Sequence, residues 1–115
     1  MKLAIVGSRT FNDYDVLEMF IQDTVGISNL TMIVSGGAKG ADTLAEKFAK
    51  DYNIPIKIFR PNWKLGKSAG YLRNKDIVDE CDILIAFWDG KSKGTKHSIN
   101  LAQDSNKEYY VYFFD

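Results

Sequence analysis

The chain has 115 residues, a length that suits one domain with its own hydrophobic core. Fifteen basic residues balance fifteen acidic ones, and this absence of basic excess argues against a nucleic-acid partner. The one cysteine, Cys81, excludes an internal disulfide and fits a reducing compartment. No apolar run approaches the ~18 residues of a membrane span, and no leader precedes the first strand-like run. We therefore predict a single cytoplasmic domain over residues 1–115 with no membrane partner.

Short apolar runs alternate with amphipathic stretches along the chain. The runs are rich in Ile, Val, Phe or Tyr, as strands buried on both faces are. They cover Leu3–Val6, Met32–Val34, Ile56–Phe59, Ile83–Phe87 and Tyr110–Phe114. Helical spacing of apolar residues predicts helices over Tyr14–Val25, Ala41–Ala49, Ala69–Glu80 and Thr95–Asp104, with Asn12 and Asp13 as candidate caps of the first. This alternation predicts an α/β fold with a parallel sheet and helices on both faces.

Polar segments follow the first four strands at the edge where ligands bind in sheets of this kind. They are Gly7–Thr10, Ser35–Asp42, Arg60–Trp63 and Trp88–Thr95. Each contains glycine, hydroxyl or basic residues, and all four are expected to meet at one end of the sheet. Their convergence predicts a ligand site there.

The strongest of these segments is Ser35-Gly36-Gly37-x-x-Gly40. Glycines let the backbone approach a ligand, and the helix that follows presents free N–H groups to an anion. The alternative is that the glycines only make a tight turn and allow close packing. The spacing is neither that of a P-loop nor the usual dinucleotide fingerprint. Asp42 is either a partner of the helix dipole or an acceptor for a ribose or base.

Two arginines are candidates for neutralising a bound phosphate. Arg9 follows Gly7-Ser8 at the end of the first strand, although an exposed loop charge is the alternative. Arg73, next to Asn74, interrupts the apolar stripe of the third predicted helix. Such an arginine needs an anion, which is a ligand or an acidic side chain of the protein.

The segment before the fourth predicted helix carries the one local basic patch, with Lys91 and Lys93. Gly94 and Thr95 suit an anion-binding helix start. His97 is the only histidine and has no partner at metal-ligand spacing, so we predict neither a metal nor a cofactor.

Two tryptophans, Trp63 and Trp88, fall in loops at the predicted ligand edge. Either can stack on a base, but packing at the rim of the core is the commoner use of tryptophan.

Four motifs in order resemble the YspA-like branch of the SLOG superfamily, which also contains the DprA (Smf) and LOG (lysine-decarboxylase-like) proteins. They are Gly7-Ser8-Arg9-Thr10-Phe11, Ser35-Gly36-Gly37-Ala38-x-Gly40-Ala41-Asp42, Trp63…Gly66…Ala69-Gly70…Arg73-Asn74, and Gly90-Lys91-Ser92-x-Gly94-Thr95. The resemblance implies a Rossmann-like, three-layer α/β/α domain with strand order 3-2-1-4-5. It also implies nucleotide binding at the glycine-rich loops and leaves pairing of two copies open.

The resemblance bears on catalysis as well. LOG-like members hydrolyse nucleoside 5′-monophosphates and use an acidic residue three positions after a Gly-Thr pair. Ser98 occupies that position here, so the expected acid is missing. Many members of the branch are ligand sensors linked to phage conflict or nucleotide signalling.

Our leading hypothesis is therefore a module that binds a nucleotide or a nucleotide-derived ligand. Backbone N–H groups of Ser35–Gly37 and Gly94–Thr95 would hold phosphate, with Arg9 and Arg73 neutralising its charge. One alternative is a nucleotide N-glycosidase that uses Asp42, Asp89 or His97 as the acid. The other is DprA-like binding of single-stranded DNA, against which the balanced net charge argues.

Overall fold

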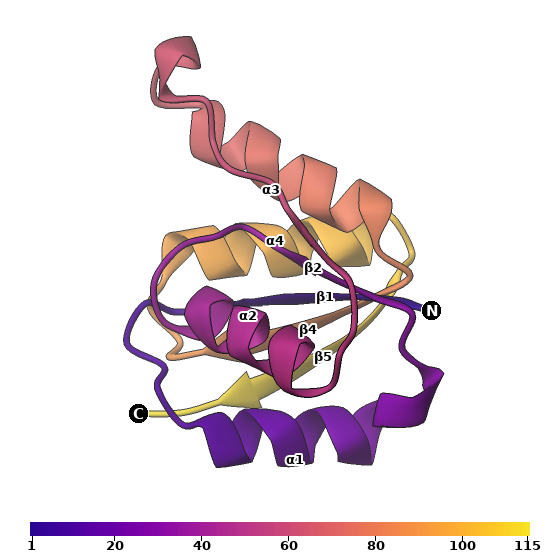
Figure 1. Cartoon of the computed structure of the whole chain (residues 1–115). Helices are drawn as coiled ribbons and strands as arrows, with labels where there is room; N and C mark the ends of the chain where they lie inside the picture. Colours follow the sequence, from indigo (N-terminus) through magenta and orange to yellow (C-terminus); the bar gives the residue numbers. More distant parts are fainter.

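The computed structural model describes residues 1–115 as a five-stranded sheet between two layers of helices (Figure 1). The strands are β1 (Lys2–Gly7), β2 (Met32–Ser35), β3 (Ile56–Ile58), β4 (Ile83–Trp88) and β5 (Glu108–Phe113). All neighbouring strands pair in parallel, in the order β3-β2-β1-β4-β5. The Rossmann-like α/β/α fold with strand order 3-2-1-4-5 is confirmed.

The helices divide between the two faces of the sheet. Helices α1 (Tyr14–Thr24) and α2 (Ala41–Asp51) cover one face, and α3 (Ala69–Glu80) and α4 (Lys93–Asp104) cover the other (Figure 1). Two short 3-10 turns, η1 (Ile27–Asn29) and η2 (Trp63–Leu65), lie between them in the chain. None of the helices has the length and apolar character needed to cross a lipid bilayer.

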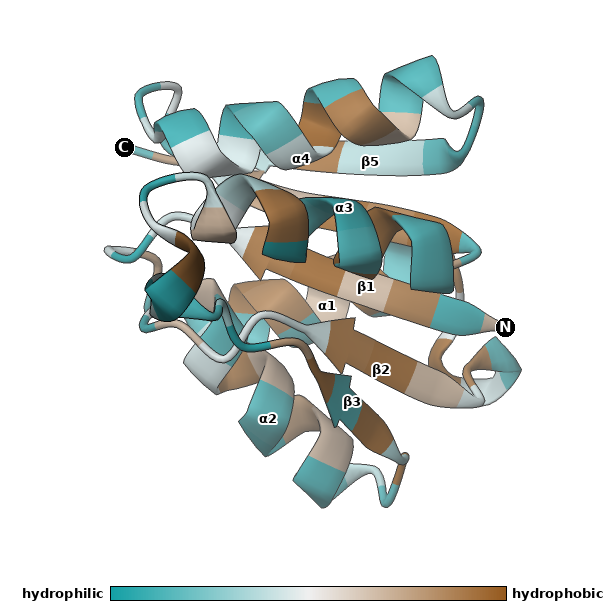
Figure 2. Cartoon of the chain, turned by 90° about the horizontal axis from the view of Figure 1, so that it is seen from above, coloured by the Kyte–Doolittle hydropathy of each residue, from teal (hydrophilic) through white to brown (hydrophobic).

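The core explains why the strand runs are almost wholly apolar. Successive side chains of a strand point to opposite faces, so Leu3 and Ile5 pack under α1 and α2 while Ala4 and Val6 pack under α3 and α4. These residues are buried, and Figure 2 shows the hydrophobic colour concentrated on β1 and β2, while β5 is pale to teal and the helices are mixed. Each fully buried Leu or Ile contributes roughly 1.5–3 kcal/mol to folding.

Two helix starts can be compared with the sequence-based predictions. The Asp13 carboxylate accepts from the Val16 N–H, so Asp13 caps α1 as expected. Helix α4 begins at Lys93, two residues before the predicted start, because the Ser92 hydroxyl accepts from the Thr95 N–H and makes Ser92 the cap.

The four loops that follow β1, β2, β3 and β4 lie at the end of the sheet toward which the parallel strands point, called here the carboxyl edge. In Figure 1 the η2 turn projects from this edge beyond the first turn of α3. The chain order alone dictates this gathering, since every helix must begin where a parallel strand ends.

Candidate functional site

A cavity of about 300 Å³ opens at the carboxyl edge, between the end of β1, the loop that follows β4 and the first turns of α2, α3 and α4. We call it the inner cavity. Seven of the twelve residues predicted for the site line it: Gly7, Arg9, Asp42, Arg73, Asn74, Gly94 and Thr95. Ser98, which stands where LOG-like enzymes have an acid, also lines it and donates from its hydroxyl to the Gly94 carbonyl over 3.3 Å.

A second hollow of about 550 Å³ adjoins the inner cavity and shares Arg9, Ala38 and Arg73 with it. We call it the outer depression. It holds two more of the predicted residues, Gly36 and Gly37. The remaining three, Ser8, Ser35 and Gly40, line neither hollow, and both serines are almost fully buried.

The two adjacent glycines of the β2–α2 loop each accept a hydrogen bond from an arginine at their carbonyl oxygen. Arg73 Nη1 donates to Gly36 O over 2.7 Å, and Arg60 Nη1 donates to Gly37 O over 3.4 Å. A Cβ on Gly36 would lie 2.5 Å from Arg73 Nη1, and a Cβ on Gly37 would lie 2.7 Å from Arg60 Nη1. The absence of side chains here therefore makes room for two guanidinium groups.

The N–H groups of the same loop are engaged more than the sequence predicts. Ala38 N donates to Asp42 Oδ2 over 3.0 Å, and Gly37 N is directed at the Ser35 hydroxyl over 3.5 Å. These two N–H groups are therefore less available to an anion than the sequence predicts.

Arg73 is held in place by its neighbours, and no acidic side chain pairs with it. Its Nε donates to Asn74 Oδ1 over 3.0 Å, while Nη2 has no protein acceptor. Burial lowers the pKa of the Arg73 guanidinium; the Asp42 charge opposes this shift and the Arg9 charge adds to it. The alternative of an ion pair with Asp42 or Asp76 does not occur.

Asn74 joins α3 to α4 behind this arginine. Its amide nitrogen lies 3.2 Å from His97 Nδ1 and 3.4 Å from the Gly94 carbonyl. Because Asn74 Oδ1 already accepts from Arg73, the amide nitrogen is the donor and His97 Nδ1 the acceptor. His97 also packs edge-on against Tyr71 and lies outside the inner cavity. It therefore supports the site and does not line it.

Asp42 is the one carboxylate in the wall of the inner cavity, and it is 7 % exposed. Burial raises the pKa of Asp42 to about 6, against the opposing effects of the Ala38 N–H and the Arg73 charge, and nearby Glu46 adds to the rise. The carboxyl therefore changes protonation close to neutral pH and can accept or donate a hydrogen bond to a ligand hydroxyl. Of the three residues considered as an acid, only Asp42 lines the inner cavity.

Gly7 and Gly40 allow close packing, which for Gly40 was the alternative considered in the sequence. A Cβ on Gly7 would lie 2.6 Å from both Ala41 Cβ and the Phe87 carbonyl oxygen. Gly40 has φ +78°, and a Cβ there would lie 2.6 Å from the Arg9 carbonyl. These two glycines press the β1–α1 loop against the start of α2 and so bring Arg9 to the site.

The β4–α4 loop is a closed hydrogen-bonded turn. Asp89 Oδ1 accepts from the N–H groups of Lys91 and Ser92, each over 2.8 Å, and these bonds lower the pKa of Asp89. The Trp88 indole donates to the Ser92 carbonyl over 3.0 Å. Trp88 and Asp89 thus shape the loop, while the N–H groups of Lys93 and Gly94 have no protein acceptor.

Positive charge gathers at the carboxyl edge without acidic partners. The inner cavity, the outer depression and a third hollow beside the β4–α4 loop contain one carboxylate, Asp42. Their lysines and arginines are Arg9, Lys39, Arg60, Arg73, Lys91, Lys93 and Lys96. None of these seven takes part in any of the four ion pairs of the structure.

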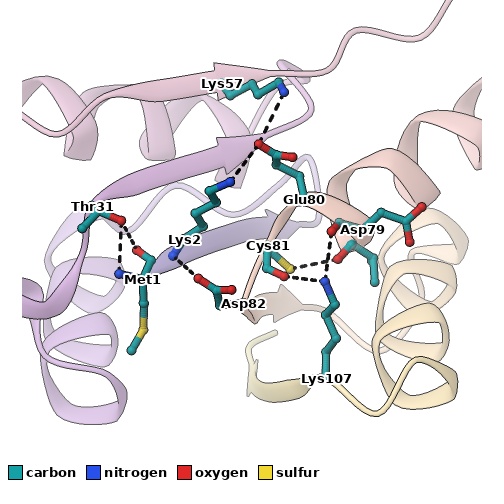
Figure 3. Close-up of polar contacts among 10 residues, drawn as sticks. Met1, Lys2, Thr31, Lys57, Asp79, Glu80, Cys81, Asp82 and Lys107 are labelled. Atoms are coloured by element: carbon teal, nitrogen blue, oxygen red, sulfur yellow. Dashed lines mark hydrogen bonds and ion pairs between the residues drawn. The ribbon is translucent and has the colours of Figure 1, made fainter.

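The opposite edge of the sheet shows the contrast (Figure 3). There Lys2 and Lys57 both pair with Glu80, over 3.3 and 3.4 Å. Lys107 donates to the backbone carbonyls of Asp79 and Cys81. The carboxyl edge thus gathers seven cations without ion pairs around its hollows, and an anionic ligand would be attracted to it.

Some residues that line the two hollows are not among the twelve predicted site residues. They include Arg60, Lys39, Ser92 and Trp63. The sequence places Arg60 in one of the four segments at the predicted ligand edge, but it does not show that the Arg60 side chain reaches the site. The carbonyl of Gly37 that seats Arg60 is visible only in the structure. No group of three or more His, Cys, Asp or Glu residues lies together as metal ligands do.

Comparison with known proteins identifies the family. The model of the YspA, cpYpsA-related SLOG family matches residues 1–66. Gene 61 protein of Mycobacterium phage D29 is 34% identical over 110 residues, covering 89% of this chain and 88% of the phage protein. The chain belongs to the YspA, cpYpsA-related SLOG family. The resemblance predicted from the four motifs is therefore confirmed.

Two solved structures of the DNA processing protein DprA share the fold of this SLOG chain. That of Streptococcus pneumoniae has a TM-score of 0.79 at 23% identity, and that of Helicobacter pylori has 0.73 at 22% identity. Each match covers 96% of this chain but only 49% and 64% of the respective DprA chain. This SLOG chain thus spans about half to two thirds of the DprA chains it matches.

One sequence-based prediction needs correction. The Helicobacter pylori DprA structure describes a single-stranded DNA binding mode, so this fold supports a nucleic-acid partner in that protein. The prediction against such a partner from balanced net charge was wrong. Net charge sums over the whole surface, whereas the unpaired cations of this SLOG chain gather at one edge.

Proposed function

We propose that this SLOG chain binds a nucleotide at the carboxyl edge, with the phosphate between Arg9 and Arg73 and the nucleoside in the inner cavity. The observation that carries the proposal is the half-buried Arg73, which lines the cavity with a free Nη2 and no acidic partner. A guanidinium in that state gains most from a phosphate, to which its free Nη2 can donate charge-assisted hydrogen bonds.

The shape and lining of the inner cavity support a small ligand. Its volume of about 300 Å³ lies at the lower end of the range for small-molecule sites. The free N–H groups of Lys93 and Gly94 at the start of α4 can add hydrogen bonds to a phosphate oxygen. Asp42 would contact a ribose hydroxyl or a base.

Titration calorimetry with inorganic phosphate, 5′-AMP, 5′-GMP and ADP-ribose tests this function. Arg73→Gln should weaken the binding of 5′-AMP by about ten- to a hundredfold, since a hydrogen bond to a charged group contributes about 1.5–3 kcal/mol. Lys75→Gln is the control, because Lys75 lies on the same helix and pairs with Asp79 at the surface. No heat of binding for any compound, or equal affinity in both variants, would contradict the proposal.

The same samples also address turnover. Asp42 is a carboxylic acid in the cavity wall, so cleavage of the N-glycosidic bond of a bound nucleotide is also measured. Chromatography of the samples after prolonged incubation detects free base if cleavage occurs.

Single-stranded DNA is a second candidate ligand, favoured by the seven unpaired cations along the carboxyl edge and by the shared fold with DprA. Affinity for a fluorescent 20-nucleotide strand should fall steeply with salt, because each phosphate that the protein neutralises releases counterions. The variant Lys91→Gln, Lys93→Gln, Lys96→Gln should lower the slope of log K against log salt by about 0.7 for each phosphate that is no longer neutralised.

A matched triple variant, Lys47→Gln, Lys50→Gln, Lys75→Gln, removes the same charge away from the carboxyl edge. It should leave the slope unchanged. Equal slopes in both triple variants, or no binding at low salt, would contradict DNA binding at this edge.

A further inference from the structure

We propose that the outer depression is a second nucleotide subsite. The base stacks on Trp63 there, and the phosphate is bound by Arg60 and Lys39. The ligand would then contain two linked nucleotide units. This inference rests on the proposed function, because the first unit occupies the inner cavity.

Trp63 is an exposed aromatic side chain at the outer depression. It lies in the η2 turn, is 64 % exposed and lines the outer depression. The other tryptophan, Trp88, has its indole N–H bonded to the Ser92 carbonyl and its ring covered by Phe113 and Lys96. An exposed indole in the wall of a cationic hollow is the arrangement that stacks nucleobases in single-strand-binding proteins.

Hydrogen bonds of the η2 turn fix the backbone that carries this indole. The Asn62 side chain accepts from the Lys64 N–H over 3.2 Å, and Gly66 N donates to the Trp63 carbonyl over 3.1 Å. The ring also reaches the first turn of α3, since a Cβ on Gly70 would lie 3.8 Å from it. The turn and α3 thus place Trp63 in the wall of the depression.

The outer depression is lined by positive charge. Arg9, Lys39, Arg60 and Arg73 line it, and no carboxylate does. Arg60 is seated on the Gly37 carbonyl on the side of the depression away from the inner cavity. Arg9 and Arg73 lie in the walls of both hollows, so a phosphate bound between them can bridge one nucleoside on each side.

The test compares 5′-AMP with the dinucleotide pApA, and 5′-TMP with pTpT, by calorimetry and tryptophan fluorescence. In the wild type each dinucleotide should bind at least about tenfold more tightly than its mononucleotide, as expected for one stacked base. It should also quench the emission of Trp63. Trp63→Ala and Arg60→Gln should each lose most of this gain and keep the mononucleotide affinity. Leu65→Ala, also exposed in the η2 turn, is the control and should keep the gain.

The outcomes separate the two proposals. If no mononucleotide or dinucleotide binds, the proposed function fails and the subsite fails with it. If mononucleotides bind but dinucleotides bind no more tightly, or if the gain survives in Trp63→Ala, the subsite is contradicted and the proposed function stands. A ten-nucleotide strand that exceeds the dinucleotide affinity supports the subsite and identifies a strand as the ligand; equal affinity supports it and identifies a dinucleotide.

Discussion

The Nη1 atom of Arg73 lies 2.7 Å from the carbonyl oxygen of Gly36, in the space that a side chain on residue 36 would fill. This hydrogen bond joins the β2–α2 loop to α3 and fixes a guanidinium at the wall of the inner cavity. It links a glycine whose role is ambiguous in the sequence to an arginine whose partner the sequence does not reveal.

Gly36→Ala should weaken phosphate binding without unfolding the protein. The backbone of Gly36 is not in the left-handed region, and the nearest atoms to an added Cβ are the end of a flexible arginine. The Arg73 tip would move aside, and the affinity for 5′-AMP should fall about tenfold by calorimetry, as for loss of one charged hydrogen bond. Gly70→Ala, in α3, should leave affinity unchanged. If Gly36→Ala and the wild type bind 5′-AMP with equal affinity, the hydrogen bond from Arg73 to Gly36 O does not contribute to binding.

Gly40→Ala should instead destabilise the fold. Its φ of +78° is strained for any residue with a side chain, and the added Cβ would meet the backbone of Arg9 and Ser8. We expect a loss of at least about 2 kcal/mol in the free energy of unfolding, which is roughly 8 °C in Tm. Thermal unfolding followed by circular dichroism measures it, and an unchanged Tm would refute the packing role of Gly40.

Ser92→Ala should cost about 1 kcal/mol of stability, because the Thr95 N–H loses its acceptor at the start of α4. Ser68 offers a matched control. It occupies the same position before α3 but makes no side-chain cap bond. Urea unfolding should therefore separate Ser92→Ala from Ser68→Ala; equal losses would contradict the cap.

Asp42→Asn should change how stability depends on pH. The folded chain holds the Asp42 proton up to about pH 6, whereas the ordinary value is 3.8. Between these pH values the folded state binds more protons than the unfolded state, so this group lowers stability as pH rises. The stability of Asp42→Asn relative to the wild type should therefore increase between pH 4 and pH 7, by up to about 3 kcal/mol.

Urea titrations at several pH values measure the effect. Asn keeps an oxygen that can accept from the Ala38 N–H, so the loop geometry is preserved. Parallel stability curves for the two proteins would show that burial does not raise the pKa of Asp42.

The fold could be predicted because its signals are local. Apolar runs buried on both faces mark β1 and β4, and the helical stripe of Ala41, Ala45 and Phe48 marks α2. The start of α4 was misplaced because Ser92, Gly94 and Thr95 are all helix-start residues, and only the hydrogen bond of Ser92 decides between them.

The site was predicted less completely, for two physical reasons. A glycine pattern does not reveal what occupies the space that a side chain would fill. Beside Gly36 that space holds the Arg73 guanidinium, and beside Gly40 it holds the backbone of Ser8 and Arg9. Net charge also carries no information on where the charges lie. The seven cations without ion pairs at the carboxyl edge are balanced in the sum by acidic residues elsewhere on the surface.

An amide-resolved NMR titration of the ¹⁵N-labelled protein with 5′-AMP tests the central claim most directly, since it shows whether and where a nucleotide binds. The account predicts saturable shifts for the N–H groups of Gly36, Ala38, Lys93 and Gly94 and for Arg73 Nε. The opposite edge of the sheet, at Lys2 and Asp82, should not move. The absence of saturable shifts, or shifts confined to residues away from the carboxyl edge, would contradict it.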